Sequence, residues 1–111
     1  MFSASFIWEP GDYDDAFHEL NSRIDEIART IPGFLGSETW LSSDGARRNA
    51  VYYWETLEAL QTFSRNPDHL EAKRQYAKWY KGYHVVIAEV LKTYGDGGVE
   101  HITPNGRNSR R

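Results

Sequence analysis

The sequence contains no cysteine, which excludes disulfides, iron–sulfur clusters and thiolate-bound zinc. It has no apolar run near the roughly 20 residues that a membrane span needs, and no signal-peptide pattern at its N-terminus. It also lacks a basic stripe, because 13 Lys and Arg residues are mixed with 16 Asp and Glu residues along the chain. Nucleic-acid-binding proteins normally show such a stripe. These absences predict neither a nucleic-acid nor a membrane partner, and a cytoplasmic location by default.

What the chain does have is an unusual share of aromatic residues. They make up 14% of the 111 residues, including four Trp and seven Tyr, whereas the 40% hydrophobic and 26% charged fractions are ordinary for a globular protein. Aromatic side chains bury a large area and suit cores, interfaces and pockets alike. A chain of this length forms one domain with a modest core.

The first half of the chain predicts a strand, a helix and a hairpin. Residues 2–9 are rich in β-forming residues and end at Pro10-Gly11, after which Asp12 is expected to cap a helix. That helix carries one apolar stripe at helical spacing, formed by Phe17, Leu20, Ile24, Ile27, Ala28 and Ile31. Residues 34–43 and 46–55 then flank Asp44-Gly45, a two-residue turn signal, and predict two antiparallel strands.

The second half predicts two helices and a last strand. Thr56 is the expected cap of a short helix, and Asn66-Pro67 begins a second helix that runs to about Tyr80. Residues 83–94 are the expected last strand, with a helix as the alternative because of Ala88, Glu89 and Leu91. The resulting order, β-α-β-β-α-α-β, predicts an α+β ferredoxin-like sandwich with an antiparallel four-stranded sheet and its helices on one face. We expect a domain over residues 1–95 and a C-terminal tail over 96–111.

Both faces of the predicted sheet are apolar. Successive strand residues point to opposite faces, so Val51 and Tyr53 oppose Tyr52 and Trp54. On the preceding strand, Phe34 and Trp40 are expected to share one face. Helices on one side leave the other side bare, and an apolar patch of that size is rare on a soluble monomer. A homodimer packed sheet to sheet would cover it; the alternative is a monomer whose free face tolerates aromatic residues.

Three segments resemble the antibiotic biosynthesis monooxygenase-like family of dimeric α+β barrels. They are "PGFLGSETW", "YYWETLEALQTF" and "HLEAKRQYAKWYKGYHVVIAEV", and the resemblance covers residues 2 to about 95. It implies a homodimer with a ligand pocket between sheet and helices in each subunit. Family members include cofactor-independent monooxygenases acting on polycyclic aromatic or quinol substrates, and haem-degrading enzymes.

The resemblance also implies site residues. Trp54 matches the pocket tryptophan of the family, and Ser5 stands where its oxygenases often carry an asparagine on the first strand. The axial histidine of the haem-degrading members corresponds to Ala72 or Lys73 here, with His69 about one turn earlier. We therefore expect no cofactor, and haem degradation ranks last among the predicted activities.

Candidate chemistry centres on the predicted helix from Asn66 to Tyr80, where His69, Tyr76 and Tyr80 share one face. A neutral imidazole beside a phenol is a suitable base for an acidic phenol or quinol when its pKa lies near the working pH. The predicted catalytic residues are His69, Tyr76 and Trp54. The predicted substrate-binding residues are Trp54, Tyr52, Ser5, Tyr80 and His84. The alternative is that these side chains only pack the core.

The leading hypothesis is a monooxygenase-like enzyme that oxidises a small aromatic or quinol-type substrate without a cofactor. The alternative is a non-catalytic, stress-associated dimer that binds a hydrophobic small molecule. Metal binding is not expected, because the four histidines are scattered without the spacing of a metal site.

Overall fold

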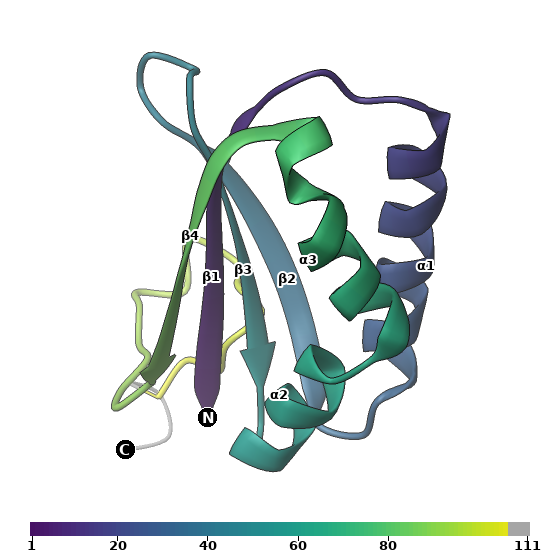
Figure 1. Cartoon of the computed structure of the whole chain (residues 1–111). Coiled ribbons are helices and arrows are strands. Elements are labelled where there is room, and N and C mark those ends of the chain that lie inside the picture. The colour runs from purple at the N-terminus through teal and green to yellow at the C-terminus, as the bar shows by residue number, and fades with distance from the viewer. Residues whose placement is uncertain (107–111) are drawn as a thin grey trace.

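The computed structural model of the chain describes residues 1–106. Within these residues the element order is β1 (Phe2–Pro10), α1 (Asp15–Thr30), β2 (Phe34–Leu41), β3 (Arg48–Trp54), α2 (Leu57–Ser64), α3 (Pro67–Trp79) and β4 (Tyr80–Glu89). The strands form one antiparallel sheet in the order β2-β3-β1-β4. The helices all lie on one face of this sheet (Figure 1). The predicted ferredoxin-like α+β fold is confirmed.

Side-chain caps fix where the helices begin. Asp14, not the expected Asp12, caps α1, because its Oδ1 accepts the backbone N–H of Phe17 at 2.8 Å. The other two caps are as predicted: Thr56 Oγ1 accepts the N–H of Ala59 at 3.1 Å, and Asn66 Oδ1 accepts that of Asp68 at 2.9 Å. Pro67 follows at the start of α3, where its missing N–H costs nothing.

The last strand differs from the prediction at both ends. It begins at Tyr80, because α3 ends at Trp79 and the chain enters the sheet at once. It ends at Glu89 because Glu89 pairs with Phe2, where β1 begins and the partner strand runs out. The hairpin loop is also longer than two residues: Ser42 N–H donates to the carbonyl of Arg47 at 2.9 Å, and Gly45 takes the positive φ of the turn.

Alternation along β3 is as expected, but β2 contains an irregularity. Trp54 and Tyr52 face the helices, and Val51 and Tyr53 face away from them. Phe34 pairs with Trp54 and faces the helices, yet the register shifts between Phe34 and Gly36. Trp40 therefore pairs with Asn49 and lies on the opposite face from Phe34. The expectation that Phe34 and Trp40 share a face was wrong, because one extra residue reverses every later side chain.

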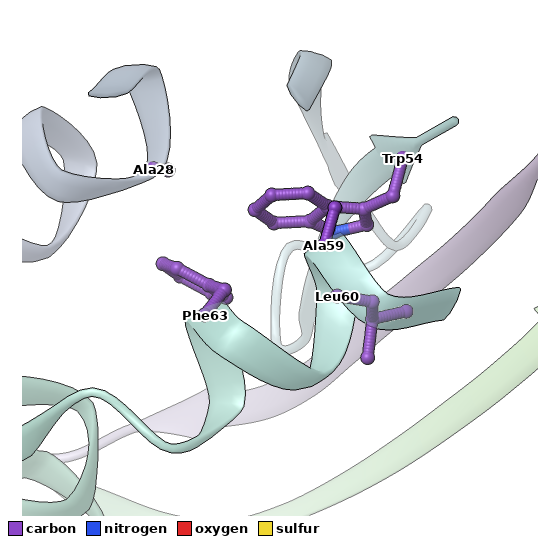
Figure 2. Close-up of a cluster of buried hydrophobic side chains, with 5 residues drawn as sticks. All are labelled: Ala28, Trp54, Ala59, Leu60 and Phe63. Carbon is purple, nitrogen blue, oxygen red and sulfur yellow. The ribbon is translucent and has the colours of Figure 1, made fainter. Parts of the chain in front are cut away.

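Two buried clusters hold the helices on the sheet. The first contains Trp54 from β3 with the α2 residues Ala59, Leu60 and Phe63, and Ala28 of α1 (Figure 2). The second joins Phe17 and Leu20 of α1 to Trp79 at the end of α3. Trp79 Nε1 also donates to the capping carboxylate of Asp14 at 3.1 Å, which ties α3 to the start of α1.

The residues after β4 return along the helix-free face of the sheet. Val90 N–H donates to the carbonyl of Met1 at 2.9 Å, and further on Ile102 lies against Gly36 of β2 (Figure 1). The predicted tail thus contacts the sheet within residues 96–106, and its last five residues, 107–111, lie outside the described residues. The boundary at residue 95 stays a prediction. No helix between residues 1 and 106 is long and apolar enough to cross a bilayer.

Candidate functional site

Trp54 stands at the end of β3 and is completely buried, with an exposed fraction of 0%. Its ring centroid lies 4.9 Å from that of Phe34 and 5.1 Å from that of Phe63. Its indole Nε1 is buried and has no hydrogen-bond partner among residues 1–106. A buried N–H without a partner costs free energy, so it calls for an explanation.

Tyr52 lies two residues before Trp54 on the same face of β3. Its ring packs against Phe63 at 5.5 Å, and its hydroxyl donates to Asp25 Oδ1 of α1 at 3.2 Å. Burial raises the pKa of Tyr52, and the nearby Asp25 carboxylate raises it further. Tyr52 therefore stays a neutral phenol whose one proton is already committed to Asp25.

His69 lies in the first turn of α3, with its ring 4.8 Å from Phe63. Burial lowers the pKa of His69 to about 4; the charge of Lys73 lowers it too, while a hydrogen bond to the Ser64 backbone opposes both. The imidazole is thus neutral near pH 7. This differs from the pKa near the working pH that the sequence analysis assumed, because the helices close over the ring. His69 Nδ1 is also buried and lacks a partner among the described residues.

Phe63 is the residue that connects these three side chains. It lies on α2 and contacts Trp54, Tyr52 and His69 through its ring. The short helix that carries Phe63 was predicted from the sequence, but Phe63 itself was given no part in the site. The available signal was its position six residues before His69, across the Asn66-Pro67 turn that folds α3 back toward α2.

Tyr76 and Tyr80 belong to a second aromatic group. Tyr76 is 40% exposed, and its ring contacts Tyr83 of β4 at 4.9 Å. Tyr80 opens β4 rather than continuing α3, and it packs against Phe6 at 5.5 Å. Burial raises the pKa of Tyr80 to about 12. Neither tyrosine has a ring contact with Trp54 among the described residues, so the structure does not assemble the predicted trio of Trp54, His69 and Tyr76 in one place.

Ser5 and His84 lie on the other face of the sheet. Ser5 pairs with Val51 and with Val86, and His84 pairs with Ile7, all at positions that alternate away from the helix-facing residues. Trp54 faces the helices. Strand alternation thus puts Ser5 and His84 on the opposite side of the sheet from Trp54, and their part in substrate binding stays a prediction.

A hollow of about 600 Å³ lies at the opposite end of α3 from His69. It forms where the β1–α1 loop meets the junction of α3 and β4, and it is lined by Pro10, Gly11, Asp12, Ala77, Lys78, Tyr80 and Lys81. Of the predicted site residues it contains only Tyr80. Its lining is mostly polar and does not include the Trp54 cluster.

Comparison with known proteins identifies the family of the chain. Residues 4–102 match the family model described as "Monooxygenase af470-like". The chain is 33% identical over 78 residues to an uncharacterised protein, YqjZ, of Bacillus subtilis, covering 69% of this chain and 68% of that protein.

Two solved structures show the same fold at low sequence identity. SnoaB, a cofactor-independent oxygenase from Streptomyces nogalater, has a TM-score of 0.67 and 13% identity, covering 83% of this chain and 94% of SnoaB. A protein from Deinococcus radiodurans, proposed to be an antibiotic biosynthesis monooxygenase, has a TM-score of 0.70 and 15% identity, covering 88% of this chain and all of that one.

Proposed function

The chain belongs to the monooxygenase af470-like family, and from that premise we propose that it oxidises a small aromatic or quinol-type substrate with dioxygen and without a bound cofactor. One observation carries the proposal. The aromatic cluster around Phe63 holds two buried polar atoms, Trp54 Nε1 and His69 Nδ1, that have no partner among residues 1–106. A cluster that served packing alone would gain stability from apolar side chains at these two places.

The two unpaired atoms have complementary hydrogen-bonding roles. Indole Nε1–H can only donate. In a neutral histidine one ring nitrogen carries the proton and the other accepts; we propose the tautomer with the proton on Nε2, which leaves the unpaired Nδ1 as an acceptor. A planar substrate with a carbonyl or phenolate oxygen and a hydroxyl group would satisfy both. Phe63 contacts both residues, so such a substrate displaces its ring on binding.

The proposed chemistry needs no electrons beyond those of the substrate. An anthrone-type substrate loses a C–H proton to His69 Nδ1 and becomes a carbanion whose charge is spread over the ring and its oxygen. The carbanion reduces dioxygen by one electron, and the two radicals then combine, which forms a C–O bond and, after protonation, a hydroperoxide. Loss of water breaks the O–O bond and leaves a carbonyl. One oxygen atom enters the product, the other leaves as water, and the substrate supplies all four electrons.

The chain's residues contribute positioning and charge stabilisation to these steps. Trp54 Nε1–H would donate to the substrate oxygen on which negative charge develops, in a dry site where such a bond is strongest. His69 has a pKa of about 4 in the closed cluster, so there it is a weak base. It becomes a stronger one only when the substrate displaces Phe63 and brings its own polar groups against the imidazole. Tyr76 lies two turns further along α3, and we assign it no step.

We further propose that the chain works as a homodimer. Large apolar side chains remain exposed on both faces of the edge strand β4, namely Tyr83, Val85, Val86 and Ile87. Trp40 is exposed on the helix-free face, where Ser5 and His84 also lie. A second copy packed on the helix-free face and around the β4 edge would bury an apolar surface that a lone chain leaves in water. Ser5 and His84 would then contact the partner rather than the substrate of their own subunit.

A second candidate function is a non-catalytic dimer that binds a hydrophobic small molecule. The low basicity of His69 favours it, since a histidine with a pKa of about 4 suits hydrogen bonding better than proton removal. Haem fits the cluster poorly. Two contacts of His69 stand against it: its ring packs on Phe63, and it hydrogen-bonds to the Ser64 backbone. An axial bond to iron would require the ring to leave both contacts. No step through haem is derived.

The test is oxygen consumption by the purified protein with anthrone- and quinol-type substrates, in the presence of a metal chelator. We expect turnover that falls strongly in Trp54→Phe and His69→Ala. Two matched controls probe the same residue types outside the cluster: Trp8→Phe, at a partly buried residue of β1, and His18→Ala, at an exposed residue of α1, are expected to keep wild-type rates.

Turnover that is equal in Trp54→Phe, His69→Ala and the two controls would contradict the assigned site. A bound aromatic molecule that survives purification, with no oxygen consumption, would select the binding-protein function instead.

A further inference from the structure

The segment after β4 carries contacts that the proposed reaction does not use. We call residues 91–106 the strap. It leaves the end of β4, loops back and reaches the helix-free face over β2 and β3, as the yellow-green trace behind the sheet shows (Figure 1). Two of its apolar side chains do not hold it there, because Leu91 is 89% exposed and Val99 is 82% exposed. A few specific anchors must therefore keep it in place.

The first anchor is Ile102 on Gly36. A Cβ atom placed at Gly36 would lie 3.1–3.3 Å from three carbon atoms of the Ile102 side chain. Gly36 also has a φ of 140°, a conformation that other residues rarely adopt. The irregularity in β2 thus supplies the bare backbone against which the strap packs.

The second anchor is a polar network centred on Glu38 of β2. His101 Nε2 lies 2.5 Å from Glu38 Oε2, and Trp40 Nε1 donates to Glu38 Oε1 at 2.9 Å. The phenol of Tyr53 also hydrogen-bonds to Glu38, and the His101 ring meets the Tyr53 ring edge-on at 5.5 Å. The Glu38 side chain is only 16% exposed, so its charge depends on these donors. His101 Nδ1 is held in turn by Thr103 Oγ1 at 2.8 Å.

The strap is closed on itself near its base. Thr93 Oγ1 donates to the carbonyl of Pro104 at 2.6 Å, and Gly106 N–H donates to the carbonyl of Thr93 at 2.8 Å. These bonds close residues 93–106 into one loop that carries His101 and Ile102. Neither anchor belongs to the hydrogen-bonded ladders of the sheet, so both could be lost with the sheet intact.

We propose that the strap is a releasable cover of the β2–β3 half of the helix-free face, latched by His101 on Glu38, and that its release increases self-association of the chain. Closed, it shields Gly36 and Tyr53 and leaves the β1–β4 half of that face, together with Trp40 of β2, open to a second copy. Open, it exposes the rest of the β2–β3 half as well. The partner is a second copy of this chain, so the inference rests on the homodimer proposed above.

The experiment compares His101→Ala and Ile102→Ala with Glu100→Ala, a matched control on the neighbouring exposed residue. Amide hydrogen exchange over residues 34–41 and 48–54 reports whether the strap is docked. We expect exchange about tenfold faster in His101→Ala, the factor that corresponds to losing one hydrogen bond to a charged group, and wild-type exchange in Glu100→Ala. Circular dichroism shows whether each variant keeps the fold.

Light scattering over a range of concentrations then measures self-association. We expect His101→Ala and Ile102→Ala to associate at lower concentration than the wild type and Glu100→Ala. Unchanged exchange in both variants would show that the strap is not anchored as described, and faster exchange with unchanged association would overturn its role as a cover. A monomeric wild type refutes only the proposed dimer; if the two variants then associate, the strap's role as a cover stands.

Discussion

The buried histidine makes stability depend on pH in a window where few other groups titrate. The pKa of His69 is lowered from 6.5 to about 4, mainly by burial. Between these values the unfolded chain binds a proton that the folded chain excludes, so acidification favours unfolding. The contribution of His69 to stability is thus complete above pH 6.5 and is lost as the pH falls toward 4.

The size of the effect follows from the same two values. One pKa unit corresponds to about 1.4 kcal/mol, so the full window amounts to roughly 3 kcal/mol, an upper value because the ring retains some contact with water. That is a large part of the roughly 5–15 kcal/mol that stabilises a typical domain. Four carboxyl groups also have lowered pKa values, namely Asp14, Glu38, Asp44 and Glu71. Because their ordinary pKa values are 4.5 or below, they change the stability only at the acid end of the window.

Urea unfolding between about pH 7.5 and pH 4.5 measures this dependence. The free energy of unfolding follows the midpoint urea concentration as long as the slope m stays constant. We expect the wild type to lose most of the roughly 3 kcal/mol, and His69→Gln, which cannot take up a proton, to show a much flatter profile. His18→Gln, a change at an exposed histidine, is the control and should follow the wild type. Equal profiles for the wild type and His69→Gln would refute the reasoning, as would an NMR titration that places the pKa of His69 near 6.5.

Three further predictions concern packing and the strap. Phe63→Ala should lower the free energy of unfolding by about 3–5 kcal/mol and let water reach His69, so NMR should show its pKa rising from about 4 toward 6.5; an unchanged pKa would contradict the proposed cause. Glu38→Gln removes a carboxylate that raises the pKa of Tyr53, so an ultraviolet titration of the phenol should give a value below the present value of about 12, still above 10 because burial remains. Gly36→Ala should destabilise the chain by about 1–3 kcal/mol in thermal unfolding, because its φ of 140° disfavours a side chain; an unchanged melting temperature would show that β2 relaxes there.

The sequence predicted the fold because its signals are local. Thr56 and Asn66-Pro67 mark helix starts by side-chain chemistry that acts within three residues. The stripe from Phe17 to Ala28 marks the buried face of α1 through helical spacing alone. Where a local signal had a close competitor it misled: Asp12 and Asp14 are both suitable caps, and only the path of the chain after Pro10 places Asp14 at the first turn.

The site was predicted less completely, because it depends on how elements pack. Trp54 was predicted from the family resemblance, and strand alternation put Tyr52 on the same face; the structure places both in the helix-facing cluster. The part of Phe63 was not found, because its contact with His69 arises where α3 turns back on α2. Tyr76 and Tyr80 were grouped with His69 by helical spacing, but α3 ends before Tyr80, and Tyr76 contacts β4.

By itself the sequence determined the order of elements, the two apolar faces of the sheet and the family resemblance, since each depends on residue type and spacing along the chain. The tertiary structure alone decided three things: the reversal of Trp40 after the irregularity at Gly36, the neutral state of His69, and the return of the strap to Glu38. Each depends on residues far apart in sequence, whose pairing, burial or contact no local pattern encodes.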